Sequence, residues 1–296
     1  MELTTRDIEI LRKLGSLVGY KYLTSTQLYL FTKHLACNKG KLKNRLTELR
    51  RWGYISRRDQ DTAEDGIRVN THDAVYQLDQ AGKRELIEHG IEAAEFEWLN
   101  AGIRHDFSTC ASVASMELFA SEQGMEFLPP SFFAARTDEN HPFRWTNIKL
   151  KTTTIDSFSP DFPIFGFRYP SGKILPIVGF ETDRGTETNS PADMERSSVL
   201  KHILCYNELD RKDAFVKRFN LNGDFYGILI QTTSELRKRN MMEAFKKVID
   251  SPEIFFFTTI PTFAKFSRRS APTGELLSRG LSRIGHNDFV LFRPEE

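Results

Sequence analysis

The chain has 296 residues, of which 40% are hydrophobic and 27% are charged, and its formal net charge is +1. This length allows two domains that each bury an apolar core. No apolar run approaches the roughly 20 residues of a membrane-spanning helix, and the N-terminus shows no secretory signal, so we expect a cytoplasmic protein without membrane contact. The widely spaced Cys37, Cys110 and Cys205 argue against a disulfide scaffold and a cysteine-based zinc site.

The small net charge hides an uneven distribution. Residues 1–60 hold 13 Lys and Arg against 5 Asp and Glu, whereas residues 61–126 hold 4 against 14. A basic surface on an otherwise neutral protein indicates a polyanionic partner, most often nucleic acid, although a solvated helix face has the same composition.

The first ninety residues predict three helices in sequence. The first begins after Thr4 or Thr5 and ends before Gly19, because apolar residues recur between them at helical spacing. The second begins at Thr24, where Thr24 and Gln27 have the spacing of a capping box.

The third predicted helix runs from Lys39 to Trp52, and Gly53 closes it. Its buried stripe is predicted to consist of Leu42, Leu46, Leu49 and Trp52. A strand at 54–58, a polar loop at 59–71 and a strand at 74–78 follow. This order predicts a winged helix-turn-helix, in which the third helix enters the major groove and the hairpin contacts flanking phosphates.

Basic and amide side chains of the third helix and the hairpin are the predicted DNA contacts, because these groups neutralise phosphates and read base edges. The predicted contacts are Lys39, Lys41, Lys43, Asn44, Arg45, Arg50, Arg51, Arg57 and Arg58. Winged helices also serve as protein-binding modules, and that alternative stays open. A helix follows Asp79, and the acidic stretch from Glu92 to Glu97 suggests a boundary between domains at 1–92 and 93–296.

The second domain alternates helices and strands, which predicts an α/β fold with a mixed sheet flanked by helices. Helices are expected at 99–123, 191–209 and 234–249, the second with Pro191 in its first turn. Strands are expected at 143–150, 163–169, 174–180, 225–231, 254–260 and 287–292. The chain lacks a Walker phosphate loop and a dinucleotide-binding fingerprint, so a nucleotide-driven motor and a dehydrogenase are not expected.

Three acids flank the predicted hairpin of the second domain. Asp161 precedes its first strand, and Glu181 and Asp183 end its second. Since side chains alternate along a strand, Glu181 and Asp183 project from one face, where Asp161 can join them. Three clustered carboxylates predict a divalent cation, and ligands that are all oxygen favour Mg²⁺ or Mn²⁺.

The pair Pro160-Asp161, followed by a hairpin and Glu-x-Asp, resembles the PD-(D/E)XK, or restriction endonuclease-like, nuclease superfamily. With the N-terminal winged helix and the string Glu-Thr-Asp-Arg-Gly-Thr-Glu at 181–187, the chain is similar over roughly residues 4–260 to the replication-relaxation family, which includes relaxases of mobilisable plasmids. The resemblance implies a nuclease-like second domain, with Asp161 and Glu181 as metal ligands. It also implies DNA nicking at a replication or transfer origin of a mobile element.

The chain departs from the superfamily pattern at Asp183, where a Lys is usual. Asp183 is then a candidate third metal ligand, and Lys201 on the following helix is the candidate replacement for the Lys. A relaxase also needs a nucleophile, for which Tyr206 is the candidate, although an aromatic residue at helical spacing is more often part of a core. His105-Asp106 and Glu117 on the long helix are further candidates for the site.

Two functions that involve DNA remain open from the sequence, besides a third interpretation as a protein-interaction adaptor within a mobile-element complex. The first is a metal-dependent DNA-nicking protein of the relaxase or endonuclease type, which acts by water or by Tyr attack. The second is a catalytically inactive replication or mobilisation accessory factor, or a transcriptional regulator, on a nuclease-like scaffold. Either would bind double-stranded DNA and act with other mobilisation or replication proteins.

Overall fold

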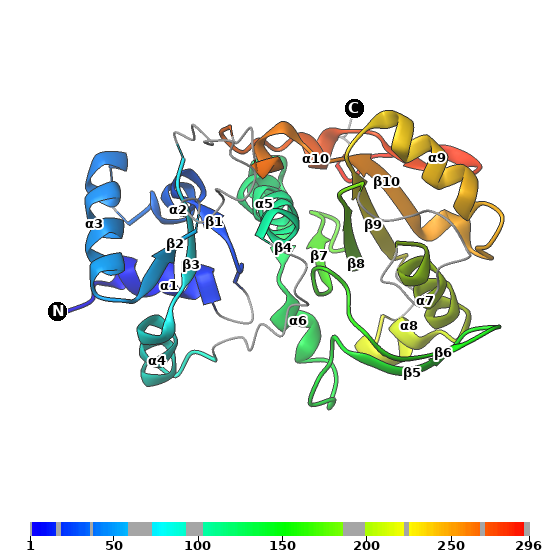
Figure 1. Ribbon diagram of the computed structural model, residues 1–296, viewed down its shortest axis with the longest axis horizontal. Helices are drawn as coiled ribbons and strands as arrows, with labels where there is room; N and C mark the ends of the chain where they lie inside the picture. The colour runs from blue at the N-terminus through cyan, green and yellow to red at the C-terminus, as the bar shows by residue number, and fades with distance from the viewer. Residues whose placement is uncertain are drawn as a thin grey trace. The chain divides into compact units, whose positions relative to one another are not determined.

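The computed structural model describes residues 2–15, 19–35, 38–58, 73–92, 103–185, 199–221, 225–266 and 270–292 (Figure 1). The chain forms two compact units: Met1–Phe119 with Pro261–Gly274, and Ala120–Ile260 with Glu275–Glu296. The boundary predicted after residue 92 stays a prediction, and the contacts group residues 103–119 with the first unit. The expected loop at 59–71, the acidic stretch up to Glu97 and the helix start at Pro191 lie outside the described residues.

Unit 1 contains the predicted helices and the predicted strand pair β2–β3, and a short strand β1 that the sequence did not predict completes a three-stranded sheet in the order β1-β3-β2 (Figure 1). Both pairings in this sheet are antiparallel. Its elements are α1 (Thr5–Gly15), β1 (Leu23–Thr24), α2 (Ser25–Thr32), α3 (Lys39–Arg51), β2 (Ile55–Arg57), β3 (Val75–Leu78), α4 (Gln80–Glu88) and α5 (Ile103–Ala120), with a 3-10 turn η4 at Thr262–Ala264.

Side-chain caps fix where the helices of unit 1 begin. The predicted capping box between Thr24 and Gln27 is present at the start of α2, and the Asn38 side chain accepts from the Lys41 N–H at the start of α3. The prediction that Trp52 is buried is wrong, since it is 56% exposed. The helix ends at Arg51, so the non-helical backbone of Trp52 turns its side chain away from the buried stripe of Leu42, Leu46 and Leu49.

A buried ion pair connects α1 and α3. The Asp7 side chain is 0% exposed and accepts from Nε of Arg45 at 3.0 Å and from Nη2 at 2.7 Å. The remaining guanidinium nitrogen of Arg45, Nη1, pairs with Glu48 Oε2 at 2.7 Å. Arg45 therefore contributes to the packing of unit 1 as well as to its basic charge.

Replacing Arg45 by alanine should lower the free energy of unfolding by about 3–5 kcal/mol, because it leaves the Asp7 carboxylate buried without its cation. Lys43→Ala, at an exposed position of the same helix, should change it by less than about 0.5 kcal/mol. Urea denaturation followed by circular dichroism measures both values. Equal stability of the two variants would contradict the role of this ion pair.

The same pair predicts an acid-dependent loss of stability. Burial raises the pKa of Asp7, but hydrogen bonds from Arg45 and Thr4 outweigh it and hold the pKa below its usual value. A depressed carboxyl pKa stabilises the fold above the unfolded-state pKa of about 3.9, and this contribution is lost as the pH falls through the lower folded-state value. Thermal unfolding of Asp7→Asn should therefore depend less on pH below about 4 than that of the unaltered protein.

Unit 2 is a mixed α/β unit, which confirms the predicted class. Its main sheet has seven strands within the described residues, in the order β12-β11-β10-β9-β8-β7-β4 (Figure 1). The strands are β4 (Glu126–Leu128), β7 (Phe165–Arg168), β8 (Ile174–Asp183), β9 (Gly227–Thr232), β10 (Phe255–Thr259), β11 (Leu281–Arg283) and β12 (His286–Phe289). The helices are α6 (Pro130–Ala134), α7 (Val199–Arg211), α8 (Ala214–Phe219), α9 (Glu235–Phe245) and α10 (Glu275–Ser278), with 3-10 turns η2 (Ser121–Gln123) and η3 (Pro252–Ile254).

Strands β7 and β8 form the predicted hairpin, whose turn contains Gly172 at φ +82°. Strand β8 pairs in parallel with β9, and β9 pairs in parallel with β10. Helices α7, α8 and α9 lie on one face of this sheet, and their apolar side chains form one core with Ile228 and Ile230 of β9 (Figure 1). The central position of β8 places its last residues beneath these helices.

A separate two-stranded ribbon, formed by β5 (Trp145–Lys149) and β6 (Thr154–Phe158), packs on the same core. The sequence did not predict β6. In β5 the buried residues are Trp145 and Ile148, three positions apart, because Asn147 adopts a left-handed φ of +55° that interrupts the usual alternation. No helix in the described part of the chain is long and apolar enough to cross a membrane.

Candidate metal centre

The pairing of β8 explains the position of Asp161. Strand β7 pairs with β8 only up to Ile177, so the last residues of β8 extend beyond this neighbour. An isolated bridge joins Phe162 to Phe180, and Asp161 Oδ2 accepts the Thr182 N–H at 2.8 Å. Asp161 thus satisfies a backbone donor that β7 leaves without a strand partner, and this contact holds its carboxylate beside Glu181.

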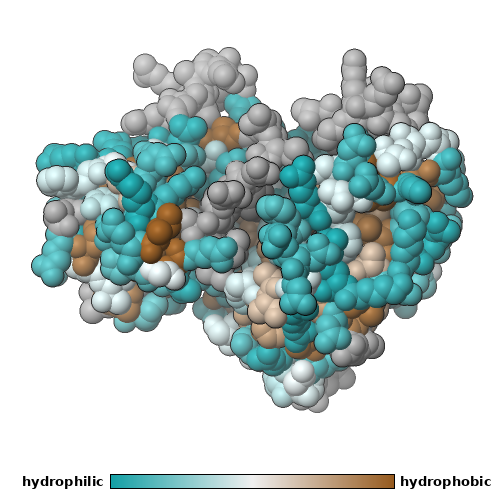
Figure 2. Space-filling model, turned by 90° about the horizontal axis from the view of Figure 1, so that it is seen from below, coloured by the Kyte–Doolittle hydropathy of each residue, from teal (hydrophilic) through white to brown (hydrophobic). Residues whose placement is uncertain are grey.

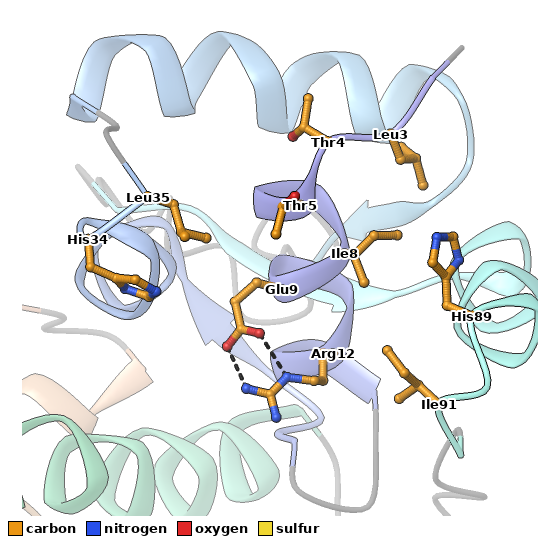
Figure 3. Close-up of a pocket in the computed structure, with 10 residues that line it drawn as sticks. All are labelled: Leu3, Thr4, Thr5, Ile8, Glu9, Arg12, His34, Leu35, His89 and Ile91. Carbon is orange, nitrogen blue, oxygen red and sulfur yellow. Dashed lines mark hydrogen bonds and ion pairs between the residues drawn. The ribbon is translucent and has the colours of Figure 1, made fainter.

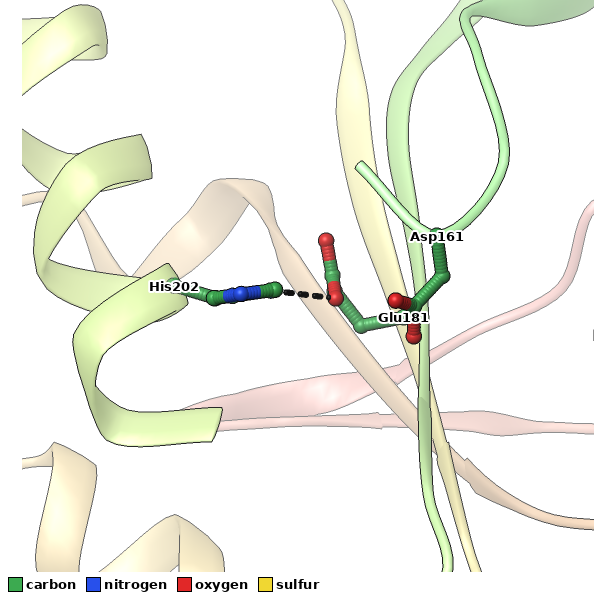
Figure 4. Close-up of side chains that lie close together, drawn as sticks. All are labelled: Asp161, Glu181 and His202. Atoms are coloured by element: carbon green, nitrogen blue, oxygen red, sulfur yellow. Dashed lines mark hydrogen bonds and ion pairs between the residues drawn. The ribbon is translucent and has the colours of Figure 1, made fainter. Parts of the chain in front are cut away.

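Helix α7 supplies two partners to Glu181. His202 and Tyr206 are four residues apart and therefore lie on the same side of the helix. His202 Nδ1 lies 2.7 Å from Glu181 Oε2, and the Tyr206 hydroxyl donates to Glu181 Oε1 at 2.5 Å. Both oxygens of this carboxylate are thus engaged, and Figure 4 shows the imidazole directed at Glu181 with Asp161 beside it.

Asp161, Glu181 and His202 form what we call the acid–histidine cluster. Each offers one ligand atom, and these atoms lie within 4.8 Å of one another. Ligands bound to one ion at about 2.0–2.6 Å lie no further apart than about 5 Å, so the cluster fits a single divalent cation. Two carboxylates with one imidazole also match the ligands used by Mn²⁺ and other first-row metals, whereas the predicted set consisted only of oxygen ligands.

Burial changes the acidity of the cluster. Desolvation, followed by the charge of Asp161, raises the pKa of Glu181 to about 7, although His202 and the two hydrogen bonds oppose this shift. Burial and then the charge of Glu181 also raise the pKa of Tyr206 well above its usual value. The Tyr206 hydroxyl therefore stays protonated and keeps donating to Glu181 at neutral pH.

Asp183 has a different set of partners, although it lies on the same strand. Its side chain is 0% exposed and forms a two-point ion pair with Arg237 of α9, in which Nη2 lies 2.8 Å from Oδ1. The Thr232 hydroxyl and the Gly185 N–H also donate to it, at 2.6 and 3.0 Å. Within the described residues Asp183 is not part of the acid–histidine cluster, and its role as a metal ligand stays a prediction.

The comparison with protein-family models decides the family. The model described as replication-relaxation matches residues 14–220, more than two thirds of the chain. The chain belongs to the replication-relaxation family. Family membership indicates a role in replication or mobilisation and implies an interaction with DNA. Neither the curated proteins nor the solved structures include a significant match to the chain.

The acid–histidine cluster lies inside the segment that matches the replication-relaxation family, whereas Arg237 lies beyond it. Lys201, the predicted replacement for the superfamily Lys, is half-buried on α7 next to His202. Asp106 and Glu117 belong to unit 1, where Asp106 pairs with Lys21 and Glu117 binds Lys13 and Tyr20. These two acids stabilise unit 1 through α5.

The predicted DNA contacts of this family member fall into two groups. Arg45, Arg57 and Arg58 are half-buried, and Arg45 is committed to Asp7. The other six predicted contacts are exposed side chains on α3: Lys39, Lys41, Lys43, Asn44, Arg50 and Arg51.

Unit 1 also contains an open pocket of about 550 Å³, lined by residues of α1 and of the ends of α2 and α4 (Figure 3). The ion pair between Glu9 and Arg12 lies along its wall, and His34 and His89 lie at its edges. None of its lining residues belongs to the acid–histidine cluster.

Sequence reasoning missed His202. The available signal was its spacing of four residues from Tyr206, which places both on one helix face. The sequence could not show that this face covers the end of β8, because the packing of a helix on a sheet depends on contacts distant along the chain.

Gly179 should be required for the contact between Tyr206 and Glu181. A Cβ atom at this position would lie 2.2 Å from the Tyr206 hydroxyl oxygen. Gly179→Ala should therefore displace Tyr206 and cost about 1–3 kcal/mol in the free energy of unfolding. Gly40→Ala is the control, because its Cβ would meet nothing closer than 3.5 Å, and it should be neutral or stabilising.

Urea denaturation measures both glycine variants. Tyr206→Leu and Gly179→Ala should both lower the free energy of unfolding by disturbing the same contact. The double variant should therefore lose less free energy of unfolding than the sum of the two single losses. Strictly additive effects would show that Tyr206 does not confine this position.

Proposed function

We propose that this chain is a metal-dependent DNA-nicking protein that acts at a replication or transfer origin of a mobile element. The observation that carries the proposal is the acid–histidine cluster, two carboxylates and an imidazole brought within 4.8 Å at the end of a central strand. In a chain of the replication-relaxation family, the natural substrate of such a centre is a phosphodiester bond.

Unit 1 would locate the DNA. The succession α1, β1, α2, α3 and the β2–β3 hairpin agrees with a winged helix-turn-helix, and α3 carries the exposed basic side chains. In that arrangement α3 enters the major groove and the hairpin contacts flanking phosphates. The residues we expect to contact DNA are the six exposed ones of this helix: Lys39, Lys41, Lys43, Asn44, Arg50 and Arg51.

Unit 2 would carry the chemistry on a nuclease-like sheet. Asp161, Glu181 and His202 would hold Mn²⁺ or Mg²⁺, which supplies Lewis-acid stabilisation of the charge that develops on the scissile phosphate. The Tyr206 hydroxyl fixes one oxygen of Glu181, and the Thr182 N–H fixes one oxygen of Asp161. These two contacts hold the carboxylates in place before the metal or the DNA binds.

Attack by water agrees better with this arrangement than attack by Tyr206. The Tyr206 hydroxyl is buried and protonated, and it is already bonded to Glu181. A buried phenol with a raised pKa is a weak nucleophile, and it has no room to accept a nucleotide. We therefore assign Tyr206 the task of positioning Glu181.

Nicking of a supercoiled plasmid that carries the native origin, in the presence of Mn²⁺ or Mg²⁺, tests the proposal. Glu181→Ala should lower the rate at least about a hundredfold, because it removes a metal ligand. Tyr206→Phe should lower it by only about tenfold, since Glu181 keeps its other contacts. Glu126→Ala, an exposed acid on β4, is the control and should nick at the normal rate.

The outcomes of this assay separate the possible activities. Abolition of nicking by Tyr206→Phe, together with protein held covalently on DNA, would replace hydrolysis by the relaxase reaction. Absence of nicking with every metal, combined with tight binding to origin DNA, would overturn the enzymatic proposal.

One observation favours a non-catalytic role as the second candidate. Arg237 neutralises Asp183, the residue that stands where the superfamily usually has a Lys. A site without that Lys suits an accessory factor or a regulator that keeps the sheet as a scaffold. This role predicts that Glu181→Ala binds origin DNA and supports replication as well as the unaltered protein does.

A further inference from the structure

The β5–β6 ribbon of unit 2 has two unlike faces. One face is buried in the core through Trp145, Ile148, Ile155 and Phe158. The opposite face is exposed and entirely polar, and it consists of Arg144, Thr146, Asn147, Lys149, Thr154, Asp156 and Ser157. A ribbon with a polar outer face and a fully packed inner face is anchored on one side and exposed to solvent on the other.

The charge of the exposed face is suited to an anion. Between residues 143 and 158 the chain has three cationic side chains, Arg144, Lys149 and Lys151, and only one acid, Asp156. The tip between the strands consists of Leu150, Lys151 and two exposed threonines, Thr152 and Thr153, and it is closed by a hydrogen bond from the Leu150 N–H to the Thr153 carbonyl at 2.8 Å. Lysine and threonine are side chains that bind phosphate oxygens.

Helix α8 holds the ribbon in place. The Arg218 guanidinium lies 3.5 Å from the centre of the Trp145 ring and donates to the carbonyl oxygens of Pro142 and Arg144 at 3.2 and 2.8 Å. Trp145 also packs edge-on against Phe215. The polar face is therefore carried on a fixed support and not on a free loop.

The ribbon is connected directly to the acid–histidine cluster. Phe158, its last residue, packs edge-on against the rings of His202 and Tyr206, with centroids 5.2 and 5.0 Å apart. Asp161 follows three residues later. At about 3.3 Å per residue, Lys151 at the tip lies at most about 33 Å from Asp161 along the chain, which is within the roughly 34 Å of one duplex turn.

We propose that the β5–β6 ribbon is a second DNA contact that binds the phosphate backbone of the duplex. The phosphates that it binds lie within one duplex turn of the phosphate that reaches the acid–histidine cluster. This inference rests on the proposed function, because it takes duplex DNA as the ligand of unit 2. Two cationic side chains near the tip offset the repulsion that the acids of the cluster exert on the same backbone. Figure 2, which shows the side where the ribbon lies in Figure 1, has a largely hydrophilic surface with small apolar areas.

The test measures the salt dependence of DNA binding by the full chain, without metal, so that no cleavage occurs. The probe is a 40-base-pair duplex of mixed sequence, and the ribbon variant carries Lys149→Ala and Lys151→Ala. The matched control, Lys246→Ala with Lys247→Ala, removes the same charge from exposed positions next to α9, which lies away from the ribbon in Figure 1.

Each phosphate contact contributes about 0.9 to the slope of log affinity against log salt. The ribbon variant should therefore lose about 1.8 from this slope, which corresponds to a loss of roughly 60-fold in affinity at 0.1 M salt if the affinities are equal at 1 M salt, while the control keeps both values. Lys149→Arg with Lys151→Arg should restore the slope, and thermal unfolding should be the same for all variants.

The results distinguish the two proposals. An unchanged slope in the ribbon variant, with normal DNA binding by the unaltered protein, would overturn the ribbon contact alone. Absence of DNA binding by the unaltered protein would overturn the ribbon contact and the proposed function together.

Discussion

The cost of burying the Glu181 carboxylate determines how unit 2 is organised around the end of β8. A buried carboxylate needs compensating contacts, since removal from water costs several kcal/mol. Two of its partners come from α7, where His202 and Tyr206 reach its two oxygens. The absence of a side chain at Gly179 makes room for Tyr206, and Phe158 packs against both α7 side chains. Glu181 thus connects β8 with α7, and Phe158 connects α7 with the ribbon.

Features that depend on local sequence were predictable. The capping box at Thr24, the β7–β8 hairpin with its glycine turn and the longer helices and strands follow from residues close together in the chain, whereas short elements such as β6 were missed. The position of Asp161 beside Glu181 was also predictable, because the hairpin brings both to one edge. The ion pair of Asp183 was not predictable from the sequence. Its partner, Arg237, lies 54 residues away on a helix whose packing on the sheet no local pattern encodes.

Counts of charged residues likewise do not show which charged side chains are exposed and which are bound to a buried partner. Arg45 belongs to the basic segment that suggested a DNA partner, yet its guanidinium is bound to the buried Asp7. The exposed lysines of α3 and the lysines at the ribbon tip have no such buried partner among the contacts described above. Basic side chains thus include a packing element, Arg45, as well as the exposed lysines of the proposed DNA contacts, and burial separates the two groups. A sequence of the same composition with different burial would bind polyanions with a different strength.

The pairing of Asp183 with Arg237 also sets the electrostatic potential that a polyanion meets. Were all three acids of β8 and its neighbouring loop free, the end of this strand would present three negative charges to an incoming phosphate. Arg237 cancels one of them through two contacts, and the remaining pair faces the imidazole of His202. Under the proposed function, one divalent cation would then neutralise the acid–histidine cluster, and a phosphate would approach it without a second ion.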